Sequence, residues 1–143
     1  MKVVIIIIFI LCACVMSACG GQPAVTPDPD LPTGTETNAP AIYRRIGAVD
    51  AKVMMDSGEP YILLDVRTLE EYTESRIEGA TLIPYDEITA RAESELPDKT
   101  ALILIYCRSG RRSATAAETL VGMGYTNVFD FGGILDWPYD TVT

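Results

Sequence analysis

The chain has 143 residues and a formal charge of −9 at pH 7, with 11 lysines and arginines against 20 aspartates and glutamates. Its length suits a single folded domain, and its negative charge argues against nucleic acid as a partner. The chain contains no histidine, which excludes Cys-His proteases, histidine-based acid-base chemistry and the usual zinc sites. We expect neither a bound metal nor a cofactor.

The first segment has the pattern of an export signal. Met1 and Lys2 precede an apolar run from Val3 to Leu11, and small residues stand directly before Cys19. This arrangement is typical of a secretory signal peptide, and its end resembles the lipobox of bacterial lipoproteins. The resemblance implies that residues 1–18 are a lipoprotein signal peptide and that lipid is attached to the Cys19 sulfur. The expected location is the outer side of the cytoplasmic membrane, or the periplasmic face or outer membrane in a host that has one.

Two other interpretations of this segment stay open. The stretch from Val3 to Ala18 has 16 residues, short of the roughly 20 that a membrane-spanning helix needs, yet it could remain uncleaved as an anchor. Lipidation at Cys14 is the other alternative.

Residues 19–40 differ in composition from the rest of the chain. Between Gly20 and Pro40 there are five prolines and almost no large apolar side chain. Such a segment cannot bury enough apolar surface to fold, so we expect the lipidated Cys19 to be followed by a disordered tether. The folded domain is predicted over residues 41–143.

The cysteines leave one free thiol in the mature chain. Cys12 and Cys14 lie in the predicted signal and Cys19 would carry lipid, so Cys107 has no disulfide partner. An exported protein with one unpaired cysteine keeps it either as a packing group or for its reactivity.

From residue 41 onward, strand-like and helix-like segments alternate. Glycines and prolines separate them where turns are needed. This order is typical of an α/β domain with a central parallel sheet of about five strands and helices on both faces. The predicted strands cover 42–46, 61–65, 80–83, 101–106 and 128–131, and the predicted helices cover 49–55, 69–74, 86–94 and 111–122.

Cys107 lies between a buried strand and a helix. Residues 101–106 are almost wholly apolar, which predicts a strand buried on both faces. Ligands bind at this edge of a parallel sheet, because free backbone N–H groups and the helix dipole favour an anion there. The same field lowers the pKa of a thiol, so Cys107 is the candidate nucleophile. The following helix has one apolar stripe, made by Ala114, Ala117, Leu120 and Val121.

Three arginines surround this cysteine. A loop gains nothing from concentrating arginines unless anionic partners meet them, so the loop is a candidate substrate-binding segment. We expect Arg112 to be the most useful of the three for a bound anion, and Arg108 to point to solvent. The loop consists of Cys107, Arg108, Ser109, Gly110, Arg111, Arg112 and Ser113.

Two further charged residues end a neighbouring strand, which places them at the same edge. Asp65 is expected to cap the following turn, and Arg67 to pair with a carboxylate such as Glu71. Both are candidate supporting residues.

Motifs spread over the domain resemble the single-domain rhodanese (sulfurtransferase) family. They occur in the family's order and spacing from about Tyr43 to Trp137. They are Leu63-Leu64-Asp65-Val66-Arg67, Glu70-Glu71-Tyr72, Ile77-Glu78-Gly79-Ala80, Ile83-Pro84, the segment 106–113, and Gly132-Gly133-Ile134 with Trp137. The resemblance implies a small α/β domain, with Trp137 as packing near the site or as a border of the substrate entrance. Arg76 and Glu78 stand where the family usually has histidine and proline, so no role of that histidine is expected here.

This resemblance implies a sulfurtransferase. Cys107 would take the outer sulfur of a donor such as thiosulfate as a persulfide and pass it to a thiol or cyanide-like acceptor. Because the chain lacks histidine, electrostatics alone must activate the thiol. The expected partners are small sulfur-containing anions, such an acceptor, and the membrane through the lipid anchor, and the protein is expected to be a monomer.

Two other functions compete with this one. The protein phosphatase signature has arginine six residues after cysteine, a position that Ser113 occupies here, so phosphate esters are disfavoured. A membrane-tethered sulfide or persulfide carrier, or a binding module with little turnover of free thiosulfate, stays open as the alternative.

Overall fold

The computed structural model describes residues 42–143. The predicted signal peptide, the lipidation at Cys19 and the predicted tether lie outside the described residues. Within 42–143, no helix combines the length and the apolar character that crossing a membrane requires.

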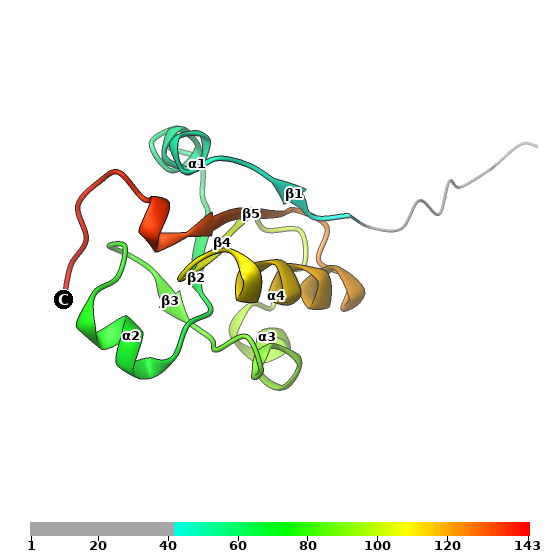
Figure 1. Ribbon diagram of the computed structural model, residues 1–143. Helices are drawn as coiled ribbons and strands as arrows, with labels where there is room; N and C mark the ends of the chain where they lie inside the picture. Colours follow the sequence, from blue (N-terminus) through cyan, green and yellow to red (C-terminus); the bar gives the residue numbers. More distant parts are fainter. Residues whose placement is uncertain (1–41) are drawn as a thin grey trace, which may run out of the picture. The chain divides into compact units, whose positions relative to one another are not determined.

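A five-stranded sheet forms the centre of the described domain (Figure 1). Every strand pairing in it is parallel, and the strand order is β1-β5-β4-β2-β3. This confirms the predicted parallel sheet, although the two edge strands are shorter than their sequence patterns indicated. The strands are β1 (Arg44–Arg45), β2 (Ile62–Asp65), β3 (Thr81–Leu82), β4 (Ile103–Cys107) and β5 (Val128–Gly133).

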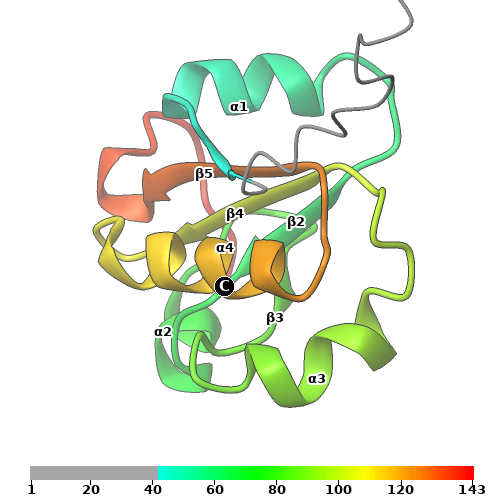
Figure 2. The ribbon, with the colours of Figure 1, turned by 90° about the vertical axis from the view of Figure 1, so that its right-hand side faces the viewer.

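Helices cover both faces of this sheet, as predicted. Figure 2 shows α1 on one side of the strands and α3 and α4 on the other. The buried side chains form two clusters that match this division, one containing Ala51 of α1 and the other containing Ile88 of α3 and Leu120 of α4. The helices are α1 (Ala48–Met55), α2 (Leu69–Glu74), α3 (Ile88–Glu95) and α4 (Arg111–Gly122), and the short 3-10 helix η1 (Ile134–Asp136) follows β5.

Strand β4 is buried on both faces, as its apolar sequence predicts. Ile105 and Cys107 belong to the cluster under α3 and α4, whereas Leu104 and Tyr106 belong to the cluster under α1. This alternation is the two-residue period of a strand. Cys107 is the last residue of β4, and its side chain points toward the α4 face.

Helix α4 is rotated slightly from the predicted stripe. Ala117 and Leu120 are fully buried as expected, but Ser113 and Ala116 are buried in place of Ala114 and Val121. The rotation turns the first turn of the helix toward the end of β4. Ser113 therefore faces the loop that begins at Cys107.

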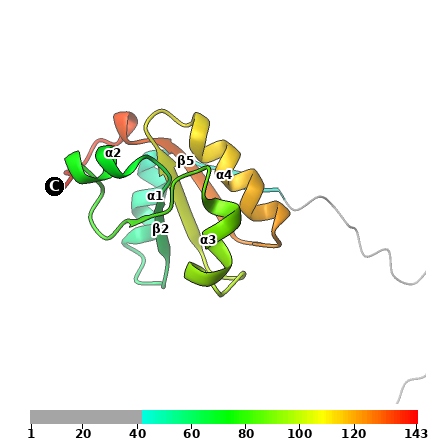
Figure 3. The ribbon, with the colours of Figure 1, turned by 90° about the horizontal axis from the view of Figure 1, so that it is seen from below.

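The last residues of the chain return to α2. Arg76, just after α2, forms an isolated antiparallel bridge with Val142, and Ser75 Oγ lies 2.9 Å from Thr141 Oγ1. Figure 3 shows the C-terminus beside α2. The sequence patterns did not predict this bridge or η1.

Candidate active site

The site is built where β4 ends and α4 begins. The register between β4 and β5 shifts between Ile105 and Cys107, where β5 contains one extra residue, and Cys107 pairs with Gly133 of β5. Gly110 precedes α4 with a φ of +94°, a conformation that L side chains rarely adopt. This turn brings the Gly110 N–H to 3.1 Å from Cys107 Sγ, which accepts it.

The thiol of Cys107 is buried, with 1% of the residue exposed. Burial raises the pKa of this thiol, but hydrogen-bond donors around it lower the pKa by more. These donors are the backbone N–H and hydroxyl of Ser113 and the backbone N–H groups of Ser109 and Gly110. The loop therefore favours a negative charge on this sulfur.

The last residue of β5, Gly133, packs closely against the backbone of the loop. A Cβ added to Gly133 would overlap the carbonyl oxygen of Arg108 and come within 2.6 Å of Ser109 Cα. The Leu135 N–H donates to the Arg108 carbonyl at 3.2 Å. The loop is thus held by the backbone that follows β5, which gives the Gly132-Gly133 motif a packing role.

Asp130 is a residue of this region that the sequence patterns did not indicate. It is fully buried, its Oδ1 accepts the Gly132 N–H at 3.0 Å, and its Oδ2 lies 3.6 Å from Nε of Arg45. These contacts fix the backbone of β5 at Gly132, whose φ is +91°. A carboxylate inside an otherwise apolar strand was the signal that could have identified it.

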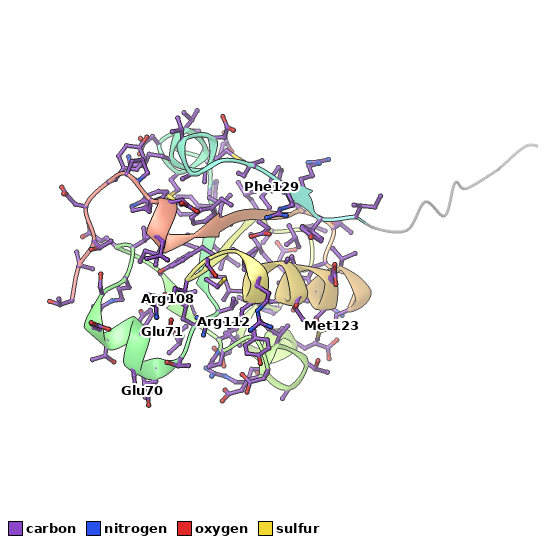
Figure 4. The ribbon with its side chains drawn as sticks, in the orientation of Figure 1. Glu70, Glu71, Arg108, Arg112, Met123 and Phe129 are labelled. Carbon is purple, nitrogen blue, oxygen red and sulfur yellow. The ribbon has the colours of Figure 1, made fainter. Side chains whose placement is uncertain are left out.

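The three loop arginines lie in different surroundings. Arg108 and Arg111 are exposed, whereas the side chain of Arg112 is 18% exposed. Arg112 donates from Nη1 to Glu71 Oε2 at 2.7 Å and from Nη2 to Glu71 Oε1 at 2.8 Å. Figure 4 shows Arg108, Arg112 and Glu71 together between the loop and α2. The positive charge of Arg112 is therefore already paired.

Glu71 is held in place by the start of its own helix. Its backbone N–H donates to Thr68 Oγ1, and its carboxylate accepts the Thr68 N–H at 3.2 Å, which together form a capping box. The hydrogen bond from Arg112 lowers the pKa of Glu71 to about 2. Glu71 thus stays ionised at any physiological pH.

Arg67 pairs with a carboxylate as expected, but the carboxylate is that of Asp65 and not that of Glu71. Arg67 pairs with Asp65, donating from Nε at 2.9 Å and from Nη2 at 2.6 Å, and also donates from Nη2 to the Ser75 carbonyl. The turn after β2 folds the guanidinium back onto a carboxylate only two residues away, and Glu71 faces the loop instead. Asp65 Oδ1 also accepts the Arg67 N–H at 2.9 Å, so Asp65 caps the turn as expected. Both side chains are buried.

A pocket of about 430 Å³ opens beside the loop. Cys107 does not line this pocket, but its neighbour Arg108 does. Arg108 is exposed, as expected, and it borders a concave surface. Trp137 borders the same pocket and also packs in the buried cluster under α1. The charged and aromatic side chains that line the pocket include Arg67, Glu71, Glu74, Arg108, Trp137 and Tyr139.

Known proteins share both this sequence and this fold. The family model described as a rhodanese-like domain matches residues 48–138. The thiosulfate sulfurtransferase PspE of Escherichia coli (strain K12) is 41% identical over 73 residues, which are 51% of this chain and 70% of that protein. A putative sulfur carrier protein of Bacillus subtilis (strain 168), YrkF, is 40% identical over 91 residues, which are 63% of this chain and 48% of that protein.

A solved structure described as a rhodanese with anions from E. coli superposes with a TM-score of 0.56 at 37% identity, over 59% of this chain and 99% of that one. The resemblance drawn from the sequence motifs is confirmed. Because the family model covers well over half of the residues, the chain belongs to the family of rhodanese-like domains.

Proposed function

We propose that the protein is a sulfurtransferase that moves a sulfane sulfur from thiosulfate or a related donor to a thiophilic acceptor through a persulfide on Cys107. The observation that carries this proposal is the surrounding of the Cys107 sulfur. Backbone donors, including the Gly110 N–H at 3.1 Å, favour its anionic form. A terminal persulfide sulfur is also an anion and needs the same kind of donors.

The loading step is a displacement at sulfur. The Cys107 thiolate attacks the outer sulfur of thiosulfate, and a new S–S bond forms as the S–S bond of thiosulfate breaks. The electron pair of the broken bond leaves on sulfite. The persulfide keeps one negative charge and sulfite carries two, which equals the charge of the reactants.

The arginines contribute unequally to this step. Arg112 is the least exposed of the three, and its charge acts on Cys107. However, both of its terminal nitrogens already donate to the carboxylate of Glu71. Arg108 and Arg111 are exposed and can attract an anion from solution. A donor dianion must therefore share Arg112 with Glu71 or rely on the two exposed arginines.

The mass of the intact protein after incubation with thiosulfate tests this proposal. We expect a gain of one sulfur atom that cyanide removes, and no gain in Cys107→Ser. A wild-type protein that gains no sulfur, or a gain that persists in Cys107→Ser, would contradict it.

A second candidate function is a sulfur carrier or binding module with little turnover of free thiosulfate. Two observations favour it: the near-complete burial of Cys107 and the neutralisation of Arg112 by Glu71. Rapid single loading of Cys107 combined with slow steady-state turnover of thiosulfate would favour the carrier over the enzyme.

We also propose that the chain is exported and anchored by lipid on Cys19, on the basis of the signal-like sequence before that residue. Cys19→Ala should release the protein from the membrane or leave it unprocessed. A variant that stays membrane-bound at the size of the wild type would instead support an uncleaved anchor.

A further inference from the structure

The pocket beside the loop holds one acidic and one basic side chain that have no partner within residues 42–143. Arg67 in its wall is held by Asp65, and Glu71 is held by Arg112. Glu74 and Arg108 line the same pocket and form neither an ion pair nor a side-chain hydrogen bond in the described domain. Because Arg67 and Glu71 are each neutralised by a partner, the unpaired charges of the pocket are the carboxylate of Glu74 and the guanidinium of Arg108.

The rest of the pocket suits an organic molecule. Trp137 and Tyr139 meet edge to face, with ring centroids 4.9 Å apart, and both line the pocket with the exposed side chain of Leu135. The volume of about 430 Å³ lies in the range of small-molecule sites, roughly 300–1,000 Å³. Cyanide and other acceptors of two or three atoms would leave most of this space unused.

We propose that this pocket binds the organic part of the sulfur acceptor and selects a zwitterionic thiol. Arg108 takes the carboxylate of the acceptor, and Glu74 takes its ammonium group. The proposal rests on the proposed function, because the pocket adjoins Cys107 only through Arg108, and the acceptor must reach the outer sulfur of a Cys107 persulfide.

The step that the pocket serves is the unloading of Cys107. The acceptor thiol reacts with the outer sulfur of the persulfide anion, and an S–S bond to the acceptor forms as the bond to Cys107 Sγ breaks. The electron pair of that bond returns to Cys107 as its thiolate. The acceptor leaves as a persulfide that keeps the thiol proton, so no oxidant or reductant is needed.

Four thiols of different charge test the selection. Protein loaded with thiosulfate and freed of excess donor is mixed with cysteine (zwitterionic), cysteamine (cationic), 3-mercaptopropionate (anionic) or 2-mercaptoethanol (neutral), and with cyanide as a small acceptor. The rate at which Cys107 loses its sulfur is followed by intact mass. Each rate in a variant is divided by the wild-type rate for the same acceptor, so that differences in intrinsic thiol reactivity cancel.

We expect Glu74→Gln to slow cysteine and cysteamine by about two- to fivefold, the range of an exposed ion pair, and not to slow the other acceptors. Arg108→Ala should slow cysteine and 3-mercaptopropionate by about the same factor. Glu70→Gln is the matched control, because Glu70 lies on the side of α2 that faces away from the loop arginines (Figure 4). That variant should leave all five rates unchanged.

Equal effects on all acceptors, or no effect of either variant, would overturn the zwitterion proposal while leaving sulfur transfer intact. Failure of the wild-type protein to load with thiosulfate would instead overturn the proposed function, and this inference with it.

Discussion

The floor and the rim of the site are built in different ways. The floor, which consists of Cys107, Gly110, Ser113 and Gly133, is buried, and its polar contacts run largely through the backbone. The rim, which consists of Arg108, Arg111 and Arg112, is formed by long side chains that are exposed or only half-buried. The difference indicates that the fold itself fixes the surroundings of the Cys107 sulfur, whereas the contacts of the rim depend on individual side chains.

The largest effect on the loading of Cys107 is expected from a change in the floor. Gly133→Ala would place a Cβ onto the Arg108 carbonyl and Ser109 Cα, both backbone atoms of the loop that cannot rotate away. We expect loading of Cys107 by thiosulfate to fall by about tenfold or more, as for a loss above ~1.4 kcal/mol, when measured per folded protein. Gly122→Ala, at the end of α4 with open space around the glycine, is the control. Loading at the wild-type rate in Gly133→Ala would show that the loop is not held this way.

The second prediction concerns the buried ion pair at the same edge of the sheet. Arg67→Ala leaves Asp65 buried without its counter-charge, because Asp65 is fully buried and Arg67 is 5% exposed. We expect a loss of about 3–5 kcal/mol in the free energy of unfolding by urea. Arg112→Ala should cost no more than about 1 kcal/mol, as for a pair closer to solvent. Equal losses in the two variants would contradict the view that the buried pair stabilises the fold more than the pair at the rim does.

The third prediction concerns binding at the rim. Arg112→Ala should raise the KM for thiosulfate. The expected loss of binding free energy is that of a charged hydrogen bond, about 1.5–3 kcal/mol. The effect on delivery of sulfur to the acceptor should be smaller, because the donor has left by then. Steady-state KM values and single-turnover unloading separate the two. An unchanged KM would indicate that Arg108 or Arg111 holds the donor.

The smallest effect is expected from the partner of Arg112. Glu71→Gln keeps the capping box, which accepts glutamine as well as glutamate, but removes the charge that competes with the donor. We expect the KM for thiosulfate to fall by about two- to fivefold, as for loss of a partly exposed ion pair, while Glu70→Gln leaves it unchanged. A rise in KM for Glu71→Gln would mean that Glu71 orients Arg112 for the donor instead of competing with it.

Local patterns were sufficient to predict much of this molecule. Short-range periodicity and glycine positions predicted strand β4, its end at Cys107 and the helix that begins at Arg111. The floor therefore lies where the sequence indicates. The contacts of the rim were harder to predict because they join distant segments. Glu71 and Arg112 meet only because α2 is set beside the loop, and that placement depends on packing in three dimensions.

The contact between the C-terminal residues and the segment after α2 was also hard to predict, because it joins distant parts of the chain. The bridge between Arg76 and Val142 involves no apolar period or turn signal that a single sequence reveals. Asp130 was missed for a different reason: its strand is short, and a carboxylate within it was assigned no role.

In the proposed reaction, one sulfur atom passes through Cys107 per turnover. Mixing the protein with excess thiosulfate in the absence of any acceptor, and measuring the sulfite released, tests it most directly. We expect one sulfite per protein molecule and none from Cys107→Ser. Continued release without an acceptor, or release from Cys107→Ser, would contradict it.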